Sequence, residues 1–102
     1  MQLRIALVRG PSMVPTLRDG DRVLVRMGTP TSPPVGRVVL VELPDRPLSV
    51  KRLVLIEPDG AVRVEGDNPF GSTDSSVLGL LPAEAIKGTV LIRLWPRPQI
   101  LR

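Results

Sequence analysis

The chain alternates apolar and polar residues in short stretches, with clusters of turn-forming residues between them. A period of two places successive side chains on opposite faces, as in strands that bury one face. The stretches that predict strands are Leu3–Val8, Arg22–Arg26, Val38–Leu43, Leu48–Glu57, Ala61–Glu65 and Thr89–Trp95. Short strands separated by turns predict an all-β fold whose sheet is small and curved or partly closed, like a barrel.

The intervening segments carry the residues that end strands. Gly10–Leu17 holds two prolines, so neither a regular strand nor the middle of a helix is expected there. Loops are expected over Gly28–Gly36 and Gly66–Ser76, which are rich in turn-forming residues. The other expected breaks are turns at Pro44–Pro47 and Pro58–Gly60, a helical turn within Leu81–Lys87, and the end of the last strand at Pro96.

Composition favours strands over helices and one domain over two. The 102 residues suffice for one compact domain, which we expect to span residues 1–102. Fourteen Val and five Ile favour strands, and 42% hydrophobic residues with 2% aromatic ones predict an aliphatic core. The uncharged run between Arg4 and Arg9 is too short for a signal peptide or a membrane span. We therefore expect a soluble, cytoplasmic chain without a membrane anchor of its own.

The absence of two residue types excludes much familiar catalytic chemistry. Without His, the chain carries no Ser-His-Asp triad and no His-ligated zinc. Without Cys, it carries no thiol nucleophile, disulfide or iron–sulfur site. The acidic loop Gly66–Ser76 lacks the closing Glu of an EF-hand calcium site, so we expect no metal and no cofactor. Any enzyme chemistry must then rest on Ser, Thr, Lys and carboxylates.

The net charge of +4 raises the question of an acidic partner. The twelve arginines and two lysines are scattered singly, and the longest basic run is Lys51-Arg52, which favours solvated strand faces. Phe70 and Trp95, the only aromatic residues, are a poor platform for stacking bases. We therefore expect no nucleic-acid partner. The alternative is a catalytically silent, basic small-barrel module that binds nucleic acid or an anionic surface.

Two residues are candidates for nucleophilic chemistry. Ser12 lies in the proline-constrained segment, where a serine is more often a turn residue, and as a nucleophile it needs a base. Lys51 lies in mid-strand, where alternation places it on the face of Leu53 and Leu55. Desolvation there favours the neutral amine, and a general base near neutrality needs a pKa of about 7–8. The alternative for Lys51 is a side chain at a strand edge that extends its amine to solvent.

These residues belong to an ordered series of motifs. The series reads Ser12-Met13-Val14-Pro15-Thr16-Leu17, Gly20-Asp21, Val50-Lys51-Arg52, Gly66-Asp67-Asn68 and Ser72-x-Asp74-Ser75. From about residue 10 to residue 88 the chain resembles the type I signal peptidase family. Its Gly-Pro-Ser-Met and Gly-Asp-Asn-Pro sequences most resemble nickel-type superoxide dismutase maturation proteases. The resemblance implies the fold of the signal peptidase catalytic core.

The resemblance also implies a Ser/Lys catalytic dyad. Ser12 would attack the scissile carbonyl, and Lys51 would act as the general base and later protonate the leaving amine. The backbone N–H of Ser12 would be the oxyanion donor, since Pro11 has none. A protein or peptide substrate would bind as an extended strand along a sheet edge, with small residues preferred before the cleavage point.

Supporting roles are implied for four other parts of the motif series. Ser72 would hydrogen-bond the lysine and hold it toward Ser12. Asp74 and the Gly66–Asn68 turn would support the loop that carries Ser72. Met13 would help line the pocket beside the nucleophile.

Two positions depart from the family pattern. Gly10 stands where many relatives have a serine whose hydroxyl assists the oxyanion. Ser76 stands where the family usually has an arginine, so Asp74 must find another partner. The second departure leaves open a chain without activity.

The function that the resemblance implies is a soluble serine endopeptidase that removes an N-terminal leader from a protein precursor. In its narrower form it implies a nickel superoxide dismutase precursor as the substrate. The alternatives are a signal peptidase-like enzyme acting on secretory leader peptides and the silent binding module described above. A self-processing domain is a further alternative, for which the few residues before the first motif leave little room.

Overall fold

The computed structural model describes residues 1–44, 46–70 and 80–101, and they form an antiparallel β-sheet. The elements are β1 (Leu3–Leu7), β2 (Arg22–Met27), β3 (Val38–Leu43), β4 (Arg46–Ile56), β5 (Val62–Glu65), the 3-10 turn η1 (Ala83–Ala85), β6 (Ile86–Trp95) and β7 (Gln99–Ile100). Among the described residues, no helix is long and apolar enough to cross a membrane. The predicted all-β class is confirmed, and the sheet is curved but not closed.

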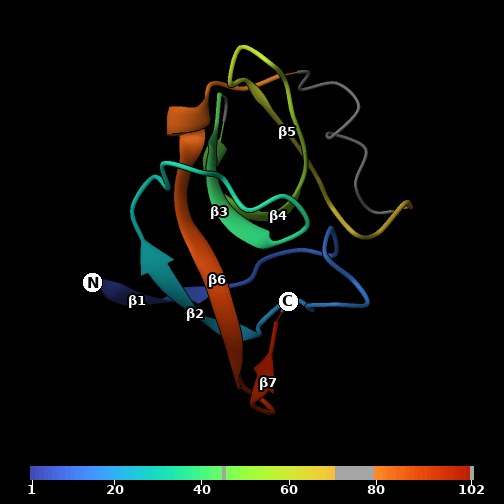
Figure 1. The fold of residues 1–102 in the computed structure, drawn as a ribbon. Helices are drawn as coiled ribbons and strands as arrows, with labels where there is room; N and C mark the ends of the chain where they lie inside the picture. Colours follow the sequence, from blue (N-terminus) through green and yellow to red (C-terminus); the bar gives the residue numbers. More distant parts are fainter. Residues whose placement is uncertain (45, 71–79, 102) are drawn as a thin grey trace.

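β6 connects the two halves of the sheet. The strand order is β1-β2-β6-β3-β4-β5, and β7 adds to β6. β6 pairs with β2 through Gly88–Trp95 and with β3 through Ile86–Thr89, and Figure 1 shows it running from one half to the other. Register shifts interrupt both ladders. Because a bulge bends its strand and increases local twist, these shifts curve the sheet.

Two clusters of buried aliphatic residues lie on opposite faces of β3. Val38 and Leu40 belong to one cluster, while Val39 and Val41 belong to the other. A strand buried on both faces needs apolar residues at successive positions, which accounts for the nearly continuous apolar run in β3. The first cluster consists of Val8, Met13, Leu17, Val23, Val25, Val38, Leu40, Val50, Val90 and Leu101. Residues of the proline-rich segment are therefore part of the core.

The expected Pro44–Pro47 turn is too long, because β4 already begins at Arg46. Leu43 pairs with Arg46, which leaves a tight connection between β3 and β4. β5 pairs with β4 only from Arg52 onward, so a proline near the start of β4 removes no hydrogen bond to β5. The strand therefore tolerates Pro47.

Beyond Pro96 the chain forms one more strand than the sequence predicts. β6 does end at Trp95, but β7 follows and pairs back onto it, with Ile92 opposite Ile100. A two-residue strand carries no periodicity of its own. It forms because a neighbouring edge is available to it.

A bulge in β4 reverses the faces to which the side chains beyond Leu53 point. Lys51 and Leu53 are buried as alternation predicts, but Leu55 is 42% exposed. The ladder with β5 shifts register between Leu53 and Leu55, so that Leu55 pairs with the exposed Arg63. The prediction that Leu55 shares the buried face of Lys51 is wrong, since an extra residue reverses the alternation beyond it.

Gly88 allows β2 and β6 to approach closely. A Cβ added at this position would lie 2.6 Å from Cγ1 of Val25 and 3.0 Å from the carbonyl oxygen of Arg26. We expect Gly88→Ala to lower the free energy of unfolding by about 1–3 kcal/mol, as overpacking of a filled core does. Chemical denaturation measures the loss, and the exposed Glu84→Ala is the control. Equal stability of the two variants would contradict this packing.

Candidate active site

The segment that carries Ser12 is a turn anchored in the core. Met13 and Leu17 are 1% and 0% exposed and belong to the first aliphatic cluster. Within the turn, the N–H of Val14 donates to the carbonyl of Pro11 at 3.1 Å, and that of Leu17 donates to Met13 at 2.9 Å. The buried side chains of Met13 and Leu17 thus anchor in the core the irregular segment that carries Ser12.

Asn68 binds the Ser12 turn through two hydrogen bonds. Its backbone N–H donates to the carbonyl of Ser12 at 2.9 Å, and its Nδ2 donates to the carbonyl of Pro11 at 3.0 Å. Its Oδ1 accepts a hydrogen bond from the N–H of Phe70 at 2.9 Å, which fixes the amide orientation. These bonds join the Gly66–Asn68 turn directly to the serine.

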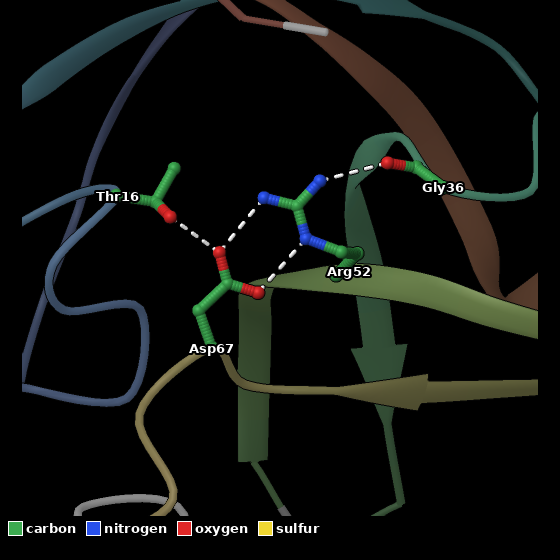
Figure 2. Close-up of polar contacts among 4 residues, drawn as sticks. All are labelled: Thr16, Gly36, Arg52 and Asp67. Carbon is green, nitrogen blue, oxygen red and sulfur yellow. Dashed lines mark hydrogen bonds and ion pairs between the residues drawn. The ribbon is translucent and has the colours of Figure 1, made fainter.

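Asp67 connects the Ser12 turn to β4. Its Oδ1 accepts from Nε of Arg52 and its Oδ2 from Nη2 of Arg52, each at 2.8 Å, in a bidentate pair. The hydroxyl of Thr16 donates to Oδ2, and Nη1 of Arg52 donates to the carbonyl of Gly36 at 2.7 Å. Figure 2 shows Asp67 between Thr16 and the guanidinium. Arg52 follows Lys51 directly, so the same carboxylate holds both segments that carry the expected dyad.

The charges of this pair stabilise each other. The hydrogen bonds from Arg52 hold the pKa of Asp67 below its ordinary value, assisted by the Thr16 hydroxyl and opposed by partial burial. The same hydrogen bonds to Asp67 raise the pKa of Arg52. Asp67 is therefore an acceptor with a negative charge throughout the neutral range.

Lys51 is 4% exposed, although it lies in a strand that also carries exposed residues. It pairs with Val39 in the ladder between β3 and β4, and its neighbour Leu53 is fully buried. This burial opposes the alternative in which the amine extends to solvent. Burial also disfavours the ammonium form relative to the neutral amine.

Ser12 and Lys51 line the same cavity, which has a volume of about 540 Å³. Its walls come from β1 with the segment that follows it, from β2 and β3, and from the first half of β4. The lining residues are Arg4–Ser12, Val25, Met27, Leu40, Arg46 and Leu48–Lys51. The two residues expected to form the dyad thus line one cavity, although they come from distant parts of the sequence.

The cavity runs along an open edge of the sheet. β1 pairs with β2 alone among the described strands. The carbonyl of Gln2 accepts from Met27, and Val8 bonds to Gly20 and Asp21, so even-numbered residues direct their backbone groups toward β2. Because these directions alternate along a strand, the N–H and C=O groups of the odd-numbered residues 3, 5 and 7 face away from β2.

Three expected supporting residues have different outcomes. Met13 lies in the core under the Ser12 turn and is not among the residues that line the cavity. It acts as an anchor of the turn, because the backbone carries its side chain inward from Ser12. Ser72 and Asp74 lie outside the described residues, as does Ser76, so their roles stay predictions.

The partners of Asp67 are not evident from the sequence. The sequence motifs contain Arg52 and Thr16 but assign neither of them a partner. A charged residue next to a buried lysine in an apolar strand is a signal for a fixed ion pair. The acidic residue in the Gly66–Asn68 turn supplies the complementary charge, but only the fold reveals that the two meet.

Comparisons with known proteins place the chain among proteases. Residues 2–77 match the family model described as Peptidase S24-like. Mitochondrial ATP-independent inner membrane protease subunit 1a of Arabidopsis thaliana is 35% identical, over 87% of this chain and 68% of its own. Mitochondrial inner membrane protease subunit 1 of Xenopus tropicalis is 32% identical, over 90% of this chain and 69% of its own. The human protein of the same name is 29% identical over the same shares.

The Asp67 network predicts a pH-dependent loss of stability. At neutral pH, Asp67→Asn should lower the free energy of unfolding by about 1.5–3 kcal/mol, because a hydrogen bond to a charged group is lost. The depressed folded-state pKa means that this stability is present above the unfolded value of about 3.9 and is lost as pH falls through the folded value. Denaturant unfolding from pH 7 to pH 3 measures both effects.

The control for this prediction is Asp59→Asn, an exposed turn residue whose Oδ1 accepts from the N–H of Ala61 at 2.9 Å. Asparagine retains that acceptor, so little change is expected. A difference between wild type and Asp67→Asn that stays constant down to pH 3 would contradict the assigned ion pair.

Proposed function

The chain belongs to the Peptidase S24-like family, and from this premise we propose that it is a serine endopeptidase with a Ser12/Lys51 dyad that removes N-terminal leaders from protein precursors. The observation that carries the proposal is the buried Lys51 in the lining of the cavity that Ser12 also lines. With no His or Cys in the chain, a neutral lysine is the base that these residues best supply.

In this mechanism the neutral amine of Lys51 takes the proton of the Ser12 hydroxyl as Oγ attacks the scissile carbonyl carbon. The resulting ammonium returns that proton to the leaving amine when the C–N bond breaks. Water then hydrolyses the Ser12 ester, with Lys51 again as the base. Arginines line the same cavity, and positive charge near an amine further disfavours its protonation.

The oxyanion formed in this reaction needs hydrogen-bond donors. The N–H of Gly10 donates to Oδ1 of Asp19 at 2.7 Å, and Pro11 has no N–H. In the segment from Gly10 to Ser12, the N–H of Ser12 is therefore the donor that we assign to the oxyanion. The carbonyl bonds from Asn68 keep the peptide groups of Pro11 and Ser12 oriented as the charge develops.

We assign the substrate chain to the open edge of β1. The outward N–H and C=O groups of residues 3, 5 and 7 can form a ladder with an extended peptide, which then reaches the Ser12 turn through Val8 and Gly10. A peptide that adds to the sheet as an extra strand is held through its main chain, so peptides of many different sequences can bind in this way. Side-chain selectivity is left to the cavity walls.

The finer proposal is that the leader belongs to a nickel superoxide dismutase precursor. It is supported by the Gly-Pro-Ser-Met and Gly-Asp-Asn-Pro sequences of this chain. The relatives named above are inner membrane protease subunits, which support a leader-removing protease in general and do not favour the dismutase precursor over a secretory leader.

Substitution of the dyad tests the mechanism. Ser12→Ala and Lys51→Arg should each lower kcat at least about 10³-fold with the fold retained, because nucleophile or base is lost. Lys51→Met tests the base with a neutral side chain in case the guanidinium disturbs packing. Lys87→Arg, the same change at the other lysine, is the control and should stay active. An active Lys51→Arg enzyme would exclude lysine as the base, because arginine does not release its proton.

The pH profile and Ser72 test the same mechanism independently. Activity should rise with pH as Lys51 loses its proton, and a flat profile between about pH 6 and pH 9 would contradict a lysine base.

Ser72→Ala should weaken turnover without eliminating it, since the proposed role of Ser72 is to orient the amine. A loss as large as that of Ser12→Ala would assign Ser72 to the chemistry itself.

The substrate proposal is tested with purified precursors. The wild-type chain should shorten a nickel superoxide dismutase precursor at its N-terminus, as measured by intact-protein mass spectrometry, and Ser12→Ala should leave it whole. A secretory leader peptide serves as the comparison substrate. Cleavage of that peptide alone would replace the dismutase precursor by the second substrate class.

A further inference from the structure

The cavity beside Ser12 is lined by basic side chains and, as far as the structure describes the chain, by no acidic one. Its charged lining residues are Arg4, Arg9, Arg46 and Lys51. Positive charge therefore comes from β1 and its continuation on one side and from the start of β4 on the other. The arginines keep this charge at any pH at which a lysine base functions.

Arg4 has a distinctive place in this lining. It pairs with the fully buried Val25, so its side chain leaves the strand on the cavity side, opposite to Leu3 and Ile5. The side chain of Arg4 is exposed and takes part in no hydrogen bond or ion pair with the described residues. By contrast, the Arg52 side chain binds the carboxylate of Asp67, and the Arg93 side chain donates a hydrogen bond to Oε1 of Gln99.

From these observations we infer that Arg4 selects substrates that carry an Asp or Glu side chain in the segment paired with β1. The inference rests on the proposed function and deepens it, because it assigns the specificity of the same cleft. A substrate strand beside β1 alternates its side chains between the cavity and solvent. A carboxylate on the cavity side meets a planar guanidinium that can bind it with two hydrogen bonds.

The position of the acidic residue follows from strand geometry. Arg4 precedes Val8 by four residues, which spans roughly 13 Å at 3.3 Å per residue, and the Ser12 turn begins just beyond Val8. The selected residue should therefore lie about four residues from the scissile bond. Ala6 lies between Arg4 and Val8 on the same face, so the intermediate position offers space without charge.

Labelled peptides test this inference. A fluorescein-labelled set of Ser/Ala/Val peptides carries Asp, Asn or Lys at each position in turn. Binding to the Ser12→Ala chain is measured by fluorescence polarisation, and cleavage by wild type is measured by mass spectrometry. At one position, the peptide with Asp should bind about twofold to fivefold more tightly than the peptide with Asn, as an exposed ion pair allows, and the effect should appear in KM with kcat unchanged.

Charge variants separate a direct contact from an effect of net charge. Arg4→Gln should remove the preference for Asp, and Arg4→Glu should shift it to Lys at the same position. Arg26→Gln removes one positive charge from the solvent-facing side of β2, where Arg26 pairs with Leu3, and should leave the preference unchanged.

Each other outcome overturns a defined part of the argument. No preference at any position, a preference that persists in Arg4→Gln, or one that Arg26→Gln removes equally would overturn the assignment of Arg4. If neutral peptides are cleaved without any preference for Asp, the inference alone fails. If no peptide is bound or cleaved, the proposed function fails with it.

Discussion

The arrangement of the candidate site depends on the hydrogen bonds that the carboxylate of Asp67 accepts from Thr16 and Arg52. Ser12 and Lys51 come from a turn and a strand that no backbone ladder joins. Asp67 connects these segments, because it accepts from Thr16 in the turn and from Arg52 beside the lysine. The next residue, Asn68, holds the Ser12 carbonyl directly. The proposed dyad needs positioning to within a fraction of an ångström, and a bidentate ion pair with charge-assisted bonds is a stiff connection of the kind required.

Burial has opposite consequences for the two adjacent cations in β4. Arg52 keeps its charge because Asp67 compensates it, and it serves as structure. Lys51 is buried next to the fully buried Leu53, and its proposed role as a base rests on the general tendency of burial to disfavour a charged amine. Exchanging the two residue types would remove both properties, since arginine does not deprotonate and lysine offers no planar fork. In a chain without histidine, the proposed base therefore depends on its position in the sheet.

The sequence predicts regular elements better than it predicts contacts between them. β3 is predicted to the residue, because its apolar run reflects burial on both faces. The exposure of Leu55 is not predictable, since a bulge leaves no mark in a pattern of alternation. The motif series identifies Ser12 and Lys51 as candidates. The meeting of Asp67 with Arg52 arises from tertiary folding, because nothing near either residue specifies the other.

The open edge of β1 has a second consequence, for the behaviour of the protein in concentrated solution. A strand with outward backbone donors and acceptors is a template for another copy of itself, and Leu3, Ile5 and Leu7 expose apolar side chains along it. Self-association through this edge would bring the Arg4 side chains of two copies near each other. Repulsion between these guanidinium groups would oppose edge-to-edge pairing of the two β1 strands, and salt would weaken the repulsion by screening the charges. In the proposed binding mode, one guanidinium would therefore both oppose pairing between two copies of the edge and contact a bound peptide.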